Sequence, residues 1–359
     1  MEHDVLQKEN QITEGVIWKQ ILLFFFPILL GTFFQQLYNA ADAMIVGRFV
    51  GKEALSAVAG STGMLTQMVV GFFVGLSSGA AVLVSQYYGA RKEEMVEYAV
   101  HTFFAFSIMA GIGMSVLGIA LTSWMLEVMR TPADVMEMSR VYLWVYFGGI
   151  VGNLVYNSGA AILRAVGDSK RPLYFLIASC LINILLDLIL VIVCRLGVLG
   201  AALATILSQA LSASMVVAAL MRTEDMHRLE WRKVRLDKRM VQRMIRIGFP
   251  SGLQSVMYGL SNVIIQSAIN SLGTDHVAAW AAYSKLDGVF WMIVSAFGIA
   301  ATTFVGQNFG AGRMERVKKG VRNCMGMTLA SSAFMSFLIF NWGIYGFELF
   351  ATDPKVGEQ

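Results

Sequence analysis

The amino-acid sequence predicts an all-α polytopic membrane protein built from two parallel six-helix repeats, and three observations support this prediction. Apolar runs of about 20 residues, long enough to cross a bilayer as a helix, recur along the whole chain. The composition is 56% hydrophobic and only 14% charged, with a mean hydropathy of +0.61, whereas soluble globular proteins carry about 25% charged residues. The chain also repeats itself at a fixed offset. An outer-membrane β-barrel would instead show weakly alternating segments of about ten residues.

The apolar runs predict nine spanning helices. They cover residues 17–47, 54–84, 97–123, 137–162, 173–194, 198–221, 243–271, 277–305 and 320–347. The joints between them carry the glycine, proline and charged residues that are typical of turns, as in Gly51-Lys52-Glu53 and Thr131-Pro132. The first apolar run is too long for the core of a signal peptide. We therefore expect it to remain in the membrane as the first helix.

The distribution of Lys and Arg predicts the orientation of these helices. If successive joints alternate between the two sides, the N-terminus and the joints near residues 91, 168, 222–246 and 313–322 share one side and hold 21 of the 28 Lys and Arg residues. Because positive charge favours the cytoplasmic side, we expect a multi-pass protein of the cell membrane with a cytoplasmic N-terminus. The long basic joint at 222–246 is interpreted as a cytoplasmic linker rather than as a nucleic-acid patch or an anionic-lipid contact.

Two copies of one pattern are related by an offset of 221–223 residues. Phe26-Pro27 recurs as Phe249-Pro250, Asn39 as Asn262, Gly51 as Gly273 and Pro132 as Pro354. The segment Ser85-Gln86 followed by Gly89-Ala90 recurs as Gly306-Gln307 followed by Gly310-Ala311. Six spans lie within one period, which is an even number, so the two copies cross the membrane in the same direction. Parallel repeats of this kind are one of the standard designs of transporters.

The repeat also predicts the domain boundaries. We expect an N-terminal lobe of six helices at residues 1–221, a cytoplasmic linker at 222–246 and a partial C-terminal lobe of three helices at 247–359. The second copy reaches Gln359 where the first copy has reached only Glu137. The chain is therefore interpreted as a fragment or truncated product that lacks the last three helices of twelve.

The fifth predicted span carries a polar stripe. A carboxylate at bilayer depth costs about 2.5–3.5 kcal/mol on insertion scales, so it usually faces a protein interior or a water-filled cavity. Asp187 lies near the middle of this span, and Ser179, Asn183 and Asp187 at i, i+4 and i+8 share one helix face. This stripe is a candidate site.

The first predicted span carries a second acid, Asp42. Gln35, Asn39 and Asp42 at i, i+4 and i+7 share a face, and Tyr38 lies one turn before Asp42. The second copy has Ile265 at the position that corresponds to Asp42. Any charge-coupled site is therefore expected in the first lobe.

Two prolines and one charged pair are further candidates. Pro27 and Pro250 lie inside the first apolar run of each copy, where proline kinks or breaks a helix, so both are candidate hinges. Lys285 and Asp287 lie two residues apart in the eighth span and so point to different faces. Either a substrate or gating contact or a structural role, locally solvated or paired, would account for them. Thr205 fits a small-residue packing position equally well as a functional one.

The cysteines and histidines give little support to a metal site. The three cysteines form no CxxC pair, and the four histidines form no HxxxH pair. We therefore expect no disulfide scaffold, no structural metal and no bound cofactor.

Several motifs together resemble the multidrug and toxic compound extrusion (MATE) family. They are FPILLGTFFQQLYNAADAMIVGRFVG, SQYYGAR, LRAVGDSKRP, LINILLD and GAALAT in the first copy, and GFPSGLQS and VGQNFGAG in the second. The likeness is greatest to the prokaryotic branch whose N-terminal lobe holds the cation site. It implies that Asp42, Asn183, Asp187 and Thr205 surround the coupling cation in a V-shaped protein with two lobes around a central cavity. Tyr38, Asn39, Gln35 and Ser179 are candidates for an outer layer of polar contacts.

These residues predict a cation-coupled transport mechanism. Two carboxylates in one poorly hydrated pocket oppose each other's ionisation, so the pair can hold H⁺, or Na⁺ with the oxygens of Asn183 and Thr205. Cation binding would bend the first helix and couple cation entry to substrate release through one conformational equilibrium. We expect a monomeric antiporter in the lipid bilayer, not an enzyme, that exports drug-like and often cationic amphiphiles.

Three alternatives were weighed against this function. A lipid-linked oligosaccharide flippase of the same superfamily would be expected to carry more cationic residues in its cavity, whereas here nearly all Lys and Arg lie in joints. An intramembrane aspartyl protease needs YD and GxGD settings, which Asp42 and Asp187 lack. A channel would not require doubled lobes, which favour alternating access.

Overall fold

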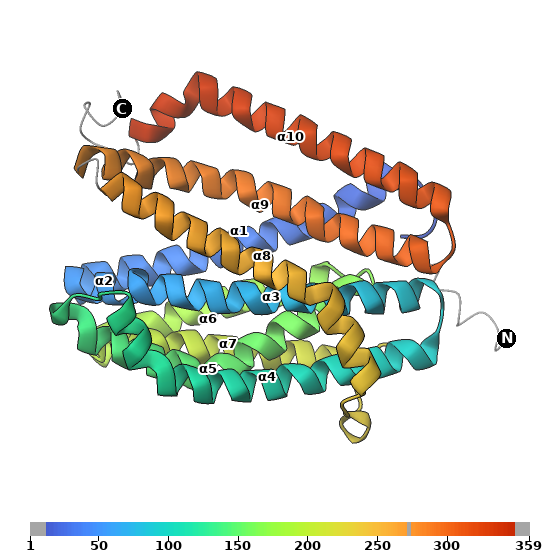
Figure 1. Ribbon diagram of the computed structural model, residues 1–359, viewed down its shortest axis with the longest axis horizontal. Helices are drawn as coiled ribbons and strands as arrows, with labels where there is room; N and C mark the ends of the chain where they lie inside the picture. Colours follow the sequence, from blue (N-terminus) through green and yellow to red (C-terminus); the bar gives the residue numbers. More distant parts are fainter. Residues whose placement is uncertain (1–11, 271–273, 349–359) are drawn as a thin grey trace.

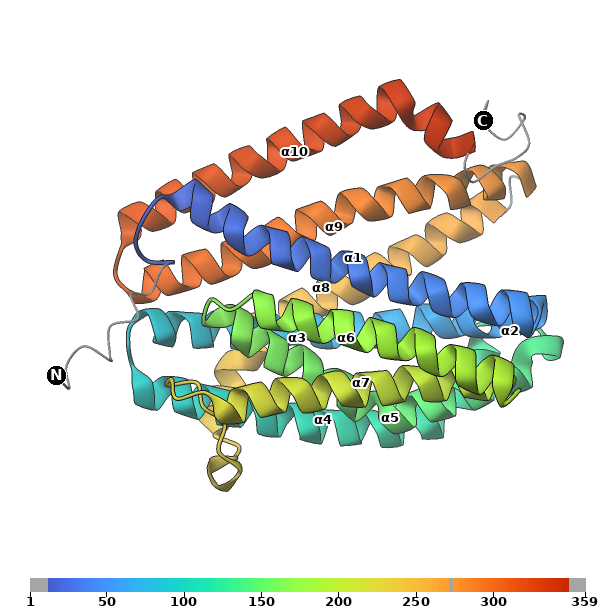
Figure 2. The ribbon, with the colours of Figure 1, turned by 180° about the vertical axis from the view of Figure 1, so that it is seen from behind.

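In the computed structural model, residues 12–270 and 274–348 are described, and they form a bundle of long helices lying side by side (Figures 1 and 2). In chain order the elements are α1 (Ile17–Phe49), α2 (Lys52–Ala59), α3 (Ser61–Gly89), α4 (Glu93–Val128), α5 (Ala133–Ala165), α6 (Lys170–Asp187), the π-helix η1 (Leu188–Val193), α7 (Gly197–Arg222), the short 3₁₀-helix η2 (Trp231–Lys233), α8 (Lys238–Asn270), α9 (Thr274–Gly310) and α10 (Met314–Glu348).

The all-helical fold class is confirmed, and each of the nine predicted helices has a counterpart in the described part of the chain. α2 and α3 together form the second, and α6 with η1 forms the fifth. By length and composition, seven of these units can cross a membrane. α5 and α8 are of similar length and lie alongside them in the bundle. Of the repeated positions, Gly273 and Pro354 lie outside the described residues.

The outer surface of the bundle is apolar, as a lipid-facing surface must be. Large apolar side chains are exposed along the outer helices, including Met44, Val116, Val193, Ile264 and Phe340. A bilayer supplies little hydrophobic driving force between helices, so close packing and buried hydrogen bonds hold such helices together.

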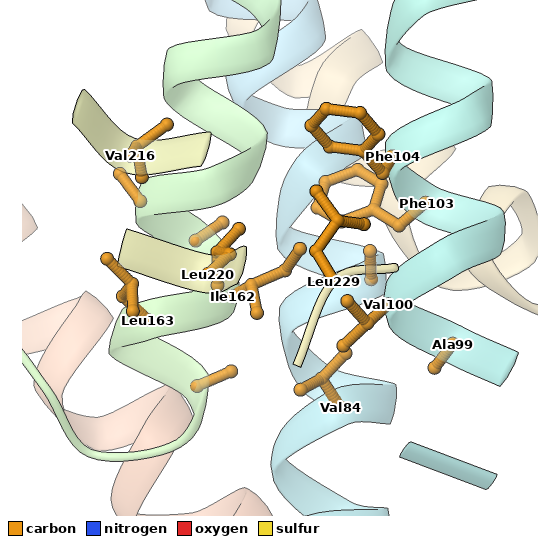
Figure 3. Packing of buried hydrophobic residues seen from close by; sticks show 14 of the residues in the cluster. Val84, Ala99, Val100, Phe103, Phe104, Ile162, Leu163, Val216, Leu220 and Leu229 are labelled. Carbon is orange, nitrogen blue, oxygen red and sulfur yellow. The ribbon is translucent and has the colours of Figure 1, made fainter. Parts of the chain in front are cut away.

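One packed core lies among α3, α4, α5 and α7 (Figure 3). Val84, Phe103, Ile162 and Leu220 are buried in it, one from each of these helices. Leu229, from the segment between α7 and α8, inserts into the same cluster and is 1% exposed. The core therefore fixes the α7–α8 segment against α3, α4, α5 and α7.

Helix boundaries differ from the prediction at two places. The second predicted span is broken at Gly60, which separates α2 from α3. α8 begins at Lys238, so the last part of the predicted linker 222–246 is helical. The reason is amphipathic packing, because Met240 and Met244, one turn apart, are buried in the core of α3, α4, α5 and α7.

α1 packs on two different groups of helices along its length. Before Pro27, the side chains of Ile21, Phe24 and Phe25 are buried against α9 and α10. Beyond Pro27, α1 packs along α6 and also reaches η1 and α7. α1 therefore bridges the helices of the second repeat and those of the first, and Pro27 lies near the change of partner.

α3 and α8 approach each other through facing glycines. A Cβ on Gly75 would lie 2.5 Å from the backbone of Gly252, and a Cβ on Gly79 would lie 2.5 Å from the backbone nitrogen of Gly248. Neither position has room for a side chain, which is the small-residue packing common between membrane helices.

The N-terminal residues and every second joint lie at one end of the bundle, on the right in Figure 1. This end carries residues 12–16 and the α3–α4, α5–α6, α7–α8 and α9–α10 joints, and we call it the basic end. Figure 2 shows the same grouping from behind.

Candidate functional site

The structure brings together Asp42, Asp187 and Thr205, and Asn183 lies one helical turn before Asp187 on the same helix. Asp42 comes from α1, Asn183 and Asp187 from α6, and Thr205 from α7. Asn183 and Asp187 are fully buried, Thr205 is 3% exposed and Asp42 is 6% exposed. The four side chains thus converge inside the bundle, away from the lipid-facing surface.

Two local features hold these helices in register. Ser179 Oγ donates a hydrogen bond of 2.8 Å to the Ser208 carbonyl, which ties α6 to α7 two turns before Asp187. On the other side of α6, Gly31 of α1 lets Leu176 approach, since a Cβ at Gly31 would lie 3.4 Å from Leu176 Cδ1. α6 is therefore fixed between the two helices that supply Asp42 and Thr205.

Asp187 is the last residue of α6 before the π-helix Leu188–Val193. A π-turn holds one more residue than an α-turn and frequently occurs at functional sites. Cys194 N donates to the Ile189 carbonyl at 2.8 Å, the wider spacing of this helix type. The change of helix type therefore falls directly after the acidic residue.

Thr205 contacts the first acid. Its Oγ1 lies 3.4 Å from Asp42 Oδ2 and 3.0 Å from the carbonyl oxygen of Ala201. A hydroxyl has one proton and two lone pairs. When Thr205 donates to Ala201, its oxygen lone pairs remain free to face a cation beside Asp42.

The two carboxyl groups lie against each other. Asp42 and Asp187 are close enough for one to donate a hydrogen bond to the other when either is protonated. Among the described residues, Asp42 Oδ1, both Asp187 oxygens and both amide atoms of Asn183 have no hydrogen-bond partner. Buried polar atoms normally have partners, so this group of unpaired atoms distinguishes the site from an ordinary packing contact.

Tyr142 and Tyr146 of α5 also lie at the site, and neither was predicted from the sequence. Tyr142 lies near Asp42, Tyr38 and Thr205. Its ring stacks on that of Tyr146, with centroids 6.2 Å and planes 14° apart. The signal in the sequence was their i, i+4 spacing in a span, which places both on one helix face.

Of the residues predicted to form an outer layer of polar contacts, Tyr38 and Ser179 lie inside the bundle, whereas Gln35 and Asn39 are exposed. Tyr38 lies near Asp42 and Thr205, although its buried hydroxyl makes no hydrogen bond to a described residue. Ser179 is buried but uses its hydroxyl for helix packing. Gln35 and Asn39 are exposed, and no contact brings them to the carboxyl groups. Gln35 shares a helix face with Asp42 but lies about 10 Å from it along the axis of α1. At that position no neighbouring helix buries this face.

The remaining candidates have simple placements. Pro27 and Pro250 both lie inside continuous helices, α1 and α8. Asp287 of α9 is half-buried, and the side chain of Lys285 lies outside the described residues. Within the described part of the chain, no group of three or more His, Cys, Asp or Glu side chains is placed to hold a metal ion.

Comparisons with known proteins agree with this fold. A family model described as MatE matches residues 27–189 and 250–359. The "Probable multidrug resistance protein YoeA" of Bacillus subtilis (strain 168) is 29% identical over 360 residues, which is 98% of this chain and 76% of that protein. The "Probable multidrug resistance protein YpnP" of the same organism is 30% identical over 361 residues, which is 98% of this chain and 79% of that protein.

A solved structure supports the same assignment at the level of the fold. The outward-facing conformation of a multidrug resistance MATE family transporter of the MOP superfamily matches with a TM-score of 0.89 at 21% identity, covering 98% of this chain and 78% of that one. The family model itself covers well over half of the sequence. This chain therefore belongs to the MATE family, whose members are membrane transporters and not enzymes.

Proposed function

We propose that this chain is a cation-coupled antiporter that exports drug-like, often cationic and amphiphilic small molecules, with H⁺ or Na⁺ binding at Asp42, Asn183, Asp187 and Thr205. The observation that carries the proposal is the contact between two buried carboxyl groups whose oxygens are mostly unpaired. The names of the relatives, both multidrug resistance proteins, support the class of substrate.

The electrostatics of the pair require a cation. Two like charges about 4 Å apart repel by about 4 kcal/mol at an effective dielectric constant of about 20. Buried carboxylates in contact therefore either share a proton or bind a positive ion between them. Oxygen ligands from two carboxylates, an amide and a hydroxyl suit a hard cation such as Na⁺ as well as they suit a proton.

The position of Asp42 suggests how cation binding reaches the rest of the protein. Asp42 lies in the part of α1 that packs on α6 and α7, whereas the part before Pro27 packs on α9 and α10. A cation that draws Asp42 toward Asp187 acts on a helix that contacts both repeats. If substrate and cation each bind more tightly to a different arrangement of α1, the binding of one weakens the binding of the other, and their transport is coupled.

The orientation follows from charge. The basic end carries most of the Lys and Arg of the chain. By the positive-inside rule this end faces the cytoplasm of a cell membrane. A lipid-linked oligosaccharide flippase is disfavoured because Lys and Arg are concentrated at helix ends and joints rather than in the spans.

The test is transport by the purified chain in proteoliposomes, with a fluorescent cationic dye and separate H⁺ and Na⁺ gradients. Asp42→Asn and Asp187→Asn should each abolish gradient-driven dye movement. Asp134→Asn, which changes an exposed acid at the start of α5, should leave it intact. Equal transport by all three variants would refute the assigned site, and dye movement with neither gradient would refute cation coupling.

A further inference from the structure

The segment before α1, residues 12–15, is bound to the second repeat. We call it the first strap. Arg313, in the joint between α9 and α10, donates to the Thr13 carbonyl and forms an ion pair of 3.1 Å with Glu14. The first strap therefore precedes α1 of the first repeat but is bound to the α9–α10 joint, just before the third helix of the second repeat.

Arg316 of α10 makes the most contacts to this strap. Its guanidinium donates to the carbonyl of Gly15 at 2.9 Å, to the carbonyl of Glu14 at 3.1 Å and to the side chain of Gln20 at 3.1 Å. Its Nε is oriented by Asn308 Oδ1 at 3.1 Å. Hydrogen bonds from a charged donor are stronger than neutral ones, so this arginine is the main anchor of the strap.

The segment before α8 is bound in a corresponding way to the first repeat. We call residues 229–237 the second strap. His101 Nε2 of α4 accepts a hydrogen bond of 2.9 Å from Glu230 N, and Thr102 Oγ1 accepts one of 3.4 Å from Asp237 N. Lys233 pairs with Glu97 at 3.1 Å. α4 thus holds the second strap through three side chains between residues 97 and 102.

The two straps are related by the internal repeat. α10 begins at Met314 and α4 at Glu93, an offset of 221 residues. An offset of 222 carries residues 12–15 to 234–237, which lie in the second strap. Each strap therefore precedes the first helix of its own repeat and lies against the third helix of the other repeat. The exchange is reciprocal.

The repeats also touch directly beside the straps. Gln307 Nε2 of α9 donates to the Ala165 carbonyl at the end of α5, at 2.7 Å. A Cβ on Gly89 would overlap the carbonyl of Gln307, and a Cβ on Gly310 would overlap the carbonyl of Gln86. The basic ends of α3 and α9 are therefore in backbone contact, with no space between them.

We infer that the two straps form a reciprocal lock that holds the basic ends of the two repeats together. Each strap continues into a helix whose first turns pack on the same facing repeat, with Phe25 of α1 on Phe297 of α9 and Met240 of α8 in the core of α3, α4, α5 and α7. The strap contacts therefore help to hold these crossing helix starts on the facing repeat. Loss of the contacts of Arg313, Arg316 or His101 weakens this hold, so the basic end should open more often. This conclusion does not depend on which ion or compound is transported.

Cysteine labelling can measure the opening directly. In a chain whose three native cysteines are replaced by Ala, Ser85→Cys places one thiol at the contact between α3 and α9, where Ser85 is fully buried against Gly306. Its rate of reaction with N-ethylmaleimide reports the fraction of time that this end is open. Arg313→Ala and Arg316→Ala should each raise that rate by about tenfold or more, because each removes more than one charge-assisted hydrogen bond.

The same measurement extends to the second strap. His101→Phe keeps a ring in the buried position but removes the acceptor for Glu230 N, and it should raise the labelling rate as well. Arg322→Ala is the matched control, because Arg322 is an exposed arginine farther along α10 that no contact joins to either strap.

A second probe separates opening from unfolding. Native Cys180, buried in α6, is retained alone in a parallel series and should stay protected in every variant. Labelling of Ser85→Cys at the rate of the Arg322→Ala control in all three strap variants would overturn the lock. An equal rise at Cys180 would overturn it too, because it would show that the substitutions unfold the bundle.

Discussion

Phe25 of α1 stacks on Phe297 of α9, with ring centroids 4.0 Å and planes 20° apart. This contact lies two residues before Pro27, and it joins the first repeat's leading helix to the second repeat. Seventeen residues after Phe25 the same helix presents Asp42 to Asp187 and Thr205. One helix thus connects the proposed cation site with the opposite half of the protein, and Pro27 lies between the two contacts.

Pro27→Ala should weaken transport more than cation binding. Proline removes one hydrogen bond of the helix and clashes with the preceding turn, at a cost of about 3 kcal/mol, so alanine favours a straight α1. Dye transport in proteoliposomes should fall, while cation affinity measured by calorimetry should change by less than about threefold. Pro250→Ala tests the second candidate hinge, in α8, which has Ile265 at the position that corresponds to Asp42. Parallel loss of transport and cation affinity in Pro27→Ala would argue against a hinge.

Thr205→Val should weaken cation binding by about tenfold. The substitution keeps the shape of the side chain but removes the oxygen that lies 3.4 Å from Asp42, and one polar contact in a buried site contributes about 1–3 kcal/mol. Thr205→Ser retains the hydroxyl and should bind nearly as the unaltered chain does. Cation titration of the purified variants checks this, and equal affinities for Thr205→Val and Thr205→Ser would remove Thr205 from the site.

Tyr142→Phe and Tyr146→Phe should differ in effect. Tyr142 lies near Asp42, Tyr38 and Thr205, whereas Tyr146 lies near Gln209. Both substitutions preserve the stacked rings. We expect Tyr142→Phe to shift cation affinity by about fivefold or more and Tyr146→Phe to leave it within about twofold. The same titration measures both, and a larger effect at Tyr146 would reverse the assignment of the two hydroxyls.

Much of the fold could be predicted because the signals that specify it are local. Apolar length locates a spanning helix, and each of the nine predicted runs overlaps described helices with ends that differ by up to about six residues, as at the starts of α8 and α10. The start of α8 was predicted too late because its arginines lower the local hydropathy. Burial of Met240 and Met244 on α3 and α4 decides the boundary instead, and that depends on the neighbouring helices.

The candidate site could be predicted only in part. A charged residue in a membrane span carries a large free-energy cost of insertion, so it indicates a functional site. Asp42 and Asp187 were predicted on this basis. Tyr142 looks like any aromatic core residue until α5 is placed beside α1 and α7. Gln35 was predicted to lie near the site because it shares a helix face with Asp42, but the neighbouring helices leave its side chain exposed. The π-helix after Asp187 carries no sequence signature that α-helical spacing would reveal.

Asp225, in the joint between α7 and α8, should make this joint sensitive to acid. Partial burial acts to raise its pKa, but His227, Tyr88 and the backbone of Met226 together lower the pKa from 3.8 to about 2. Tyr88 donates to Asp225 Oδ2 at 2.8 Å, and Met226 N donates to Oδ1 at 2.7 Å. A depressed pKa means that the folded state prefers the ionised carboxylate. The resulting stabilisation is present above about pH 4 and is lost as the pH falls toward about 2.

Asp225→Asn should therefore lower the melting temperature at pH 7 and make it less dependent on pH below about 4. The carboxylate is partly exposed, so solvent screening reduces its contribution to about 1 kcal/mol. Thermal unfolding of the detergent-solubilised chain between pH 3 and pH 7 measures this difference. Glu224→Gln, which changes the exposed neighbouring acid, should reproduce the curve of the unaltered chain. If Asp225→Asn and Glu224→Gln gave the same curve, the hydrogen bonds from Tyr88 and Met226 would contribute nothing to stability, and the docking of the α7–α8 joint would rest on Leu229 and the contacts with α4 alone.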